Sequence, residues 1–184
     1  MIARMARILR LDQSVYDEIE HHPRGIVHAA IIVMMVAIAS AIGTVLGAAT
    51  GTVEDSKLIY QALSAFLMPF AHWIVWSYLT YLLGTLVFDV RTTPWSMLRT
   101  LGYAESPQVL SILHFIPYAG IVLVTFGRLL SMRAGFLAVQ NTLGLDRRKT
   151  LLTVLPTFLC AFLLLLILRA FLVIMEIRTS LFHP

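Results

Sequence analysis

Ser96-Met-Leu-Arg-Thr-Leu-Gly-Tyr-Ala-Glu-Ser-Pro-Gln-Val-Leu110 begins the stretch of sequence that decides the fold. The chain continues through a turn at His114-Phe-Ile-Pro117 into a second apolar run, which ends at Asp146-Arg-Arg-Lys149. Charged side chains thus lie within two runs that are apolar enough to enter a lipid bilayer. A charge at the centre of a bilayer costs about 3 kcal/mol even on lenient insertion scales. We therefore expect these side chains to be buried in protein, paired or hydrated.

The composition of the whole chain predicts a membrane protein. Of its 184 residues, 59% are hydrophobic and 13% are charged, whereas about a quarter of a soluble domain is charged. We expect an all-α polytopic membrane protein, because helices satisfy their backbone hydrogen bonds within lipid. The single cysteine, Cys160, lies in an apolar run, which excludes an intramolecular disulfide and a cysteine metal cluster. No cofactor and no metal are expected.

Five apolar runs are long enough to cross a membrane as helices, which need about 20 residues each. They form one predicted membrane domain over residues 25–178, with spans at about 26–49, 58–88, 96–115, 117–141 and 150–174. The second run is longer than a bilayer requires, and Pro69 is expected to kink it. In the third run, Pro107 removes a backbone donor, which predicts a bend or a break.

The charges of the loops between these spans predict the orientation of the chain. The loops and ends on one side of the predicted membrane domain carry nine basic residues: Arg4, Arg7, Arg10, Arg24, Arg91, Arg99, Arg147, Arg148 and Lys149. Those on the other side carry only Lys57 and Arg178. Because Lys and Arg accumulate on the cytoplasmic side, we expect the N-terminus in the cytoplasm and the C-terminus outside. The same rule explains the net charge of +4, so nucleic acid is not an expected partner.

Residues 1–24 form a predicted cytoplasmic amphipathic segment ahead of the first span. Its apolar residues fall roughly along one helical face. Two placements are open: the segment lies on the membrane surface, where its arginines favour anionic headgroups, or it packs against the rest of the protein. Its arginines and the last basic loop form a predicted cytoplasmic basic surface, which comprises Arg4, Arg7, Arg10, Arg147, Arg148 and Lys149.

The third and fourth spans place two charges at the same depth. At 1.5 Å per residue, Glu105 lies about 13 Å and Arg133 about 12 Å from the cytoplasmic ends of their spans. Because a tight turn joins the spans, we predict a Glu105–Arg133 ion pair, with Arg128 as the second candidate partner. The pair either fixes the register of two helices or contributes to a site for a lipid headgroup or small anion.

The predicted intramembrane polar cluster also includes a histidine. His72 either forms a hydrogen bond to a neighbouring helix, which we favour, or relays protons. The complete predicted cluster is Arg99, Glu105, Arg128, Arg133 and His72.

Small residues recur every four positions in two of the spans and predict close helix packing. The first small-residue ridge comprises Gly43, Gly47 and Gly51, and the second comprises Gly127, Ser131 and Gly135.

Several motifs of the chain resemble those of the Yip1 family. The resemblance rests on Arg99-Thr-Leu-Gly-Tyr-Ala-Glu-Ser-Pro107, the turn at Pro117 to Gly120, Ala138-Val-Gln-Asn-Thr-Leu-Gly144, the basic Arg147-Arg-Lys149, and Leu11-Asp-Gln-Ser-Val-Tyr-Asp-Glu-Ile-Glu20. It implies a five-span protein with a cytoplasmic N-terminus. Eukaryotic relatives are linked to vesicle traffic and to binding of prenylated Rab GTPases. Only about 25 residues precede the first predicted span, which favours a prokaryotic member in the plasma membrane.

The sequence contains no Gly-rich phosphate loop, HExxH helix or nucleophile elbow, and the loops are too short for a soluble active site. We therefore predict a non-catalytic scaffold or membrane-organising protein. Its expected partners are membrane lipids, and other membrane proteins or a second copy of the chain. Two alternatives are open: a small transporter or channel component that uses Glu105, Arg128 and Arg133, and an accessory subunit whose ridges are filled by partner helices.

Overall fold

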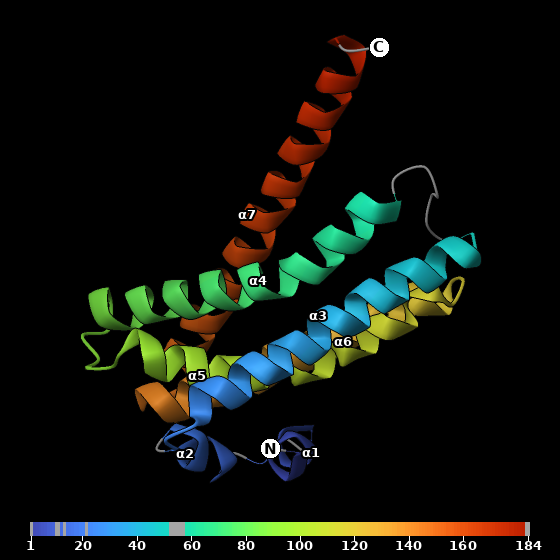
Figure 1. Ribbon diagram of the computed structural model, residues 1–184. Coiled ribbons are helices and arrows are strands. Elements are labelled where there is room, and N and C mark those ends of the chain that lie inside the picture. The colour runs from blue at the N-terminus through green and yellow to red at the C-terminus, as the bar shows by residue number, and fades with distance from the viewer. Residues whose placement is uncertain (1, 10–11, 13, 21, 52–57, 183–184) are drawn as a thin grey trace.

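The computed structural model describes residues 2–9, 12, 14–20, 22–51 and 58–182, and every regular element in these ranges is helical (Figure 1). The prediction of an all-α protein is therefore confirmed. The elements are α1 (Ile2–Leu9), α2 (Ser14–Glu20), α3 (Gly25–Ala49), α4 (Leu58–Leu86), α5 (Pro94–Ala104), the 3-10 helix η2 (Ser106–Phe115), α6 (Ala119–Leu143) and α7 (Arg147–Phe182).

Four helices of the described chain, α3, α4, α6 and α7, are long and apolar enough to cross a membrane. The first three lie within about two residues of the predicted spans, a common uncertainty at helix ends. α6 begins at Ala119 rather than at the predicted Pro117, because Tyr118 has a positive φ of 62° and cannot continue a helix backwards. It ends at Leu143, and the capping residue Gly144 has a φ of 61°, the left-handed conformation typical of a helix C-terminus.

The predicted third span, residues 96–115, is not one continuous helix. α5 ends before Glu105, and Pro107, which lacks a backbone N–H, occupies the first turn of η2. The break predicted near Pro107 is thus present, while the prediction of five membrane spans is not confirmed. The two pieces nevertheless follow α3 along its length. A Cβ atom at Gly25 would lie 3.2 Å from Arg99 Cδ, and Thr50 Oγ1 at the other end donates to the carbonyl of Phe115 at 2.8 Å.

The N-terminal segment forms two short helices that pack beneath α5 and α6 (Figure 1). Val15, Tyr16 and Ile19 of α2 are fully buried. The hydroxyl of Tyr16 donates to the carbonyl of Ala134 at 2.9 Å, and Asn141 Nδ2 donates to Asp17 Oδ1 at 2.8 Å. The segment therefore packs against the rest of the protein, as one of the two open placements expects.

Ion pairs join α1 to α2 and to the residues between them. Arg4 donates to Glu18 Oε1 at 2.6 Å, and Arg7 donates to Asp12 at 2.8 Å and to Glu18 Oε2 at 3.0 Å. These guanidinium groups hold the pKa of Asp12 and of Glu18 below the usual range of a carboxyl group. The charges of Arg4 and Arg7 are therefore balanced within the segment, and Arg10 lies outside the described residues.

We expect Tyr16→Phe to loosen this segment. The substitution removes the hydrogen bond to Ala134 but keeps the buried ring, so the expected loss of stability is about 1 kcal/mol. Hydrogen exchange of the α2 amides should become faster, and the unfolding midpoint should fall slightly. Tyr118→Phe is the matched control, since that side chain is 94% exposed. Equal exchange in both variants would contradict the role given to the Tyr16 hydroxyl.

The two small-residue ridges face the interior, where the residues around Pro107 pack against both. A Cβ atom at Gly43 would lie 2.4 Å from the carbonyl oxygen of Ser111, and one at Gly127 would lie 2.9 Å from that of Pro107. Gly47 and Ser131 are buried, and Gly135 packs against the ring of Trp76. Gly51 does not belong to the ridge: its φ is +71°, and nothing lies within 4 Å of a Cβ atom built there.

Two helices diverge from this packed centre. α3 and α6 lie side by side, while α4 moves away from α3 toward Leu58 (Figure 1). α7 crosses the bundle and extends away from it toward the C-terminus (Figure 1). The divergence leaves space among α3, α4, η2, α6 and α7.

Candidate functional site

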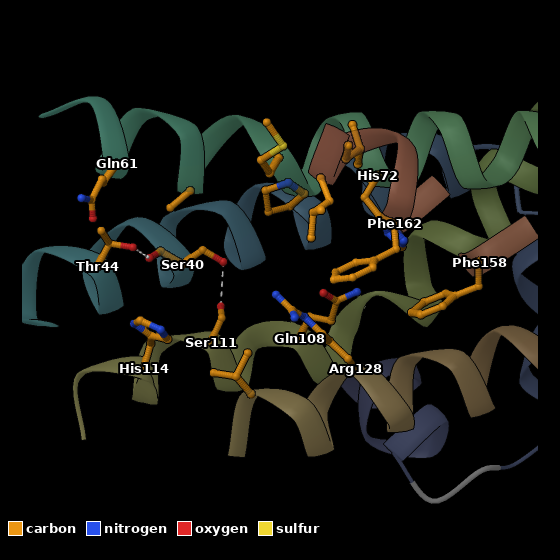
Figure 2. A pocket seen from close by; sticks show the side chains of 16 residues that line it. Ser40, Thr44, Gln61, His72, Gln108, Ser111, His114, Arg128, Phe158 and Phe162 are labelled. Carbon is orange, nitrogen blue, oxygen red and sulfur yellow. Dashed lines mark hydrogen bonds between the residues drawn. The ribbon is translucent and has the colours of Figure 1, made fainter. Parts of the chain in front are cut away.

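A cavity of about 390 Å³ occupies the space between the diverging helices (Figure 2). This volume lies within the range of small-molecule sites in proteins. Its polar wall comes mainly from α3, α4, η2 and α6 and consists of Ser40, Thr44, Gln61, His72, Gln108, Ser111, His114 and Arg128. Its apolar wall consists of Ala65, Met68, Pro69, Val124, Phe158, Phe162, Leu165 and Leu166. The cavity is therefore amphiphilic.

Arg128 of the polar wall lies well inside its apolar helix. Arg128 is nine residues from the first residue of α6, which places it about 13 Å along the helix at 1.5 Å per residue. Its guanidinium carbon lies 5.3 Å from the centre of the Phe162 ring, a cation–π distance. Across the cavity, the hydroxyls of Ser40 and Ser111 are 2.7 Å apart and hydrogen-bonded (Figure 2).

Glu105 lies behind the polar wall and organises it. Its carboxylate is 1% exposed, and Oε1 lies 2.8 Å from Nδ1 of His72. Gln108 Nε2 donates to Oε2 of Glu105 and to Ser131 Oγ. The break between α5 and η2 makes this arrangement possible, because a 3-10 helix places residues three apart directly above one another. The carboxylate thus holds the two polar groups of the wall that flank it.

The imidazole of His72 has a fixed orientation. Its ring packs against Phe158 at 5.1 Å and Trp76 at 5.5 Å between centres, while Nδ1 is held by Glu105. The other nitrogen, Nε2, is buried and has no hydrogen-bond partner in the described part of the chain. A neutral ring that donates from Nδ1 offers Nε2 as an acceptor, and a protonated ring offers a second donor. His72 therefore lines the cavity and carries a buried nitrogen without a partner among the described residues.

The predicted Glu105–Arg133 ion pair is wrong. The partners of Glu105 in the described chain are His72 and Gln108, while Arg133 is exposed and lies 5.4 Å above the ring of Phe136. The rise of a helix determines how deep a residue lies, but the face of the helix on which the residue lies determines which side chains it contacts. Glu105 lies at the break after α5 and turns toward α4, a direction that matching depths could not predict.

The structure separates the other predicted cluster residues. Arg128 and His72 line one cavity, whereas Arg99 lies beside the first turn of α3, and Arg133 lies outside the cavity lining. At the end of the bundle where α7 begins, the basic residues Arg147, Arg148 and Lys149 are exposed, and the backbone N–H of Lys149 donates to Asp146 Oδ1. In the described ranges, no three His, Cys, Asp or Glu side chains are placed to hold a metal.

The sequence prediction missed most of the polar wall. Six of its eight residues were not among the predicted site residues, although each is polar and lies within a predicted span: Ser40, Thr44, Gln61, Gln108, Ser111 and His114. Polar side chains at bilayer depth that recur on three different spans were the available signal. Gln108 also follows Glu105 by three residues across Pro107, a spacing that becomes a contact only in a 3-10 turn.

The motif Arg99–Pro107 forms part of the packed centre around this site. Every residue from 100 to 107 is buried, and a Cβ atom at Gly102 would lie 2.6 Å from that of Ala29 and 2.9 Å from Nε1 of Trp73. Searches of curated proteins and of solved structures find no match to the chain. The Yip1 domain, in contrast, matches residues 7–168, which include every residue that lines the cavity. The chain is an integral membrane protein that belongs to the Yip1 domain family.

Proposed function

We propose that this protein is a non-catalytic, membrane-organising protein that binds membrane lipids. The observation that carries the proposal is the amphiphilic cavity, whose polar wall stands beside an apolar wall from α4, α6 and α7. Lipids combine a polar headgroup with acyl chains, so one molecule would satisfy both walls. The hydroxyls of Ser40 and Ser111 are hydrogen-bonded to each other and not to His72, so neither serine is paired with a base that would activate it as a nucleophile. This arrangement supports a binding role rather than nucleophilic catalysis.

The packing argues against the two alternatives that the sequence leaves open. A transport path through Glu105 requires an accessible carboxylate. Glu105 is only 1% exposed, and its two oxygens are hydrogen-bonded to His72 and Gln108 of the cavity wall. An accessory subunit bound through the small-residue ridges requires them to face outward, but Gly43, Gly127 and Gly135 pack within the chain. Neither alternative gains support from the geometry.

The proposal includes five membrane crossings and a cytoplasmic N-terminus. Supporting this, α5 and η2 together run beside α3 from its first residues to its end, although neither is a long helix. Exposed basic residues gather at the beginnings of α3, α5 and α7 and at the ends of α4 and α6. They are Arg24, Arg91, Arg147, Arg148 and Lys149. Basic residues at such an interface attract anionic lipids of a cytoplasmic leaflet, as in a prokaryotic plasma membrane.

Lipid retention tests the proposed function. The protein would be extracted from membranes with a mild detergent, washed through a detergent gradient, and analysed by native mass spectrometry. We expect the protein to retain lipid at about one molecule per chain after the bulk lipid is removed. A membrane protein of similar size and span number, treated identically, is the control. Complete loss of lipid at the rate shown by the control would contradict the proposal.

A further inference from the structure

We propose that the cavity binds the phosphate group of an anionic membrane lipid, with Arg128 and Nε2 of His72 as its two main contacts and the acyl chains along α7. This inference rests on the lipid-binding function proposed above and specifies its headgroup. It also gives Glu105 a role, as the residue that positions His72.

The charge of the cavity wall selects an anion. Arg128 is a cation at hydrocarbon depth, and the described lining contains no carboxylate, since Glu105 lies behind His72 and Gln108. A guanidinium group forms charge-assisted, often bidentate hydrogen bonds with phosphate oxygens.

His72 supplies the second contact from the opposite side of the cavity. The side chain is about nine-tenths buried, and its Nε2 atom is without a partner among the described residues. Because Nδ1 is held by Glu105, the ring cannot turn this nitrogen elsewhere. A buried polar atom without a partner is unfavourable, so a ligand oxygen there would be stabilising.

The apolar wall selects a lipid rather than a free anion. Phe162 and Leu165 of α7 line the cavity, and Leu166, which is 53% exposed, continues this wall to the surface of the bundle. Acyl chains could therefore leave the cavity along α7 while the phosphate stays at Arg128. A water-soluble phosphate would leave this apolar wall without a partner.

The test uses nanodiscs of phosphatidylcholine that contain a minor fraction of phosphatidylglycerol. The lipid bound to the released protein is identified by native mass spectrometry. We expect wild type to retain phosphatidylglycerol in preference to phosphatidylcholine, and Arg128→Gln to retain it about tenfold less, the size of one lost charge-assisted hydrogen bond. Arg133→Gln is the matched control, because Arg133 is also a helix α6 arginine over a phenylalanine but lies outside the lining. His72→Gln should also weaken retention.

The outcomes separate this inference from the proposed function. Equal retention of phosphatidylglycerol by the Arg128→Gln and Arg133→Gln variants would overturn the inference and leave lipid binding intact. Loss of all lipid from wild type would overturn both. Displacement of the lipid by inorganic phosphate alone would show that the site takes a free anion, and would overturn the assignment to a lipid. An unchanged melting temperature of Arg128→Gln shows that the variant is folded.

Discussion

Replacement of Glu105 by leucine is expected to lower the free energy of unfolding by about 3 kcal/mol, because buried donors that lose their acceptor are strongly destabilising. The leucine would leave Nδ1 of His72 and the amide of Gln108 buried without their acceptor. At 1% exposure the carboxylate site is closed to solvent, so Nδ1 of His72 would lose its hydrogen bond outright, while Gln108 would keep only its bond to Ser131. The measurement is the unfolding midpoint of the purified protein in detergent micelles or nanodiscs.

Two further variants distinguish hydrogen bonding from packing at this position. Glu105→Gln keeps an acceptor for His72, and the amide of Gln108 can turn over to accept from the new donor, so a loss of only about 1 kcal/mol is expected. The double variant His72→Phe, Glu105→Leu replaces a polar pair with apolar groups and should recover part of the stability lost in Glu105→Leu. If Glu105→Leu unfolds at the same midpoint as wild type, the carboxylate does not hold the cavity wall together.

The same residue shows what the sequence can and cannot predict. The apolar runs correctly predict α3, α4, α6 and α7, because hydropathy over about 20 residues is a strong signal. Glu105 is correctly singled out as buried and paired, since a charge at that depth requires a partner. Its actual partner, His72, lies 33 residues away on another helix, and this contact depends on where the chain bends after Ala104. Proline predicts that a bend exists but not its direction.

The cavity could not be predicted from the sequence, because it too depends on the directions that the helices take. A void arises where helices diverge, and the divergence of α4 from α3 depends on packing at many positions (Figure 1). The small-residue ridges predict close approach correctly at Gly43, Gly127 and Gly135. They do not predict which element approaches, and a 3-10 helix that packs against two ridges at once has no recognisable sequence pattern. Gly51 has the same four-residue spacing as Gly43 and Gly47, but it lies in a turn, where it adopts a positive φ.

Gly43→Ala is expected to destabilise the protein by at least about 2 kcal/mol, even though alanine favours a helix by about 1 kcal/mol over glycine. The added methyl group would lie 2.4 Å from the carbonyl oxygen of Ser111 and 3.1 Å from Cα of Ile112. Both are backbone atoms, so a side-chain rotation cannot relieve the overlap. α3 and η2 would have to separate, which would also break the Ser40–Ser111 hydrogen bond in the cavity wall.

Gly84→Ala is the matched control for this prediction. Its added methyl group would also meet a neighbour closely, at 2.9 Å, but that neighbour is the terminal Cδ1 atom of Leu143, which a rotamer change can move away. We therefore expect Gly84→Ala to unfold within about 1 kcal/mol of wild type, because the helix preference of alanine offsets the small repacking penalty. Chemical or thermal unfolding in nanodiscs compares the two variants directly. Equal midpoints for Gly43→Ala and Gly84→Ala would mean that α3 and η2 are not held in backbone contact. The cavity wall built on that contact would then lose its structural basis.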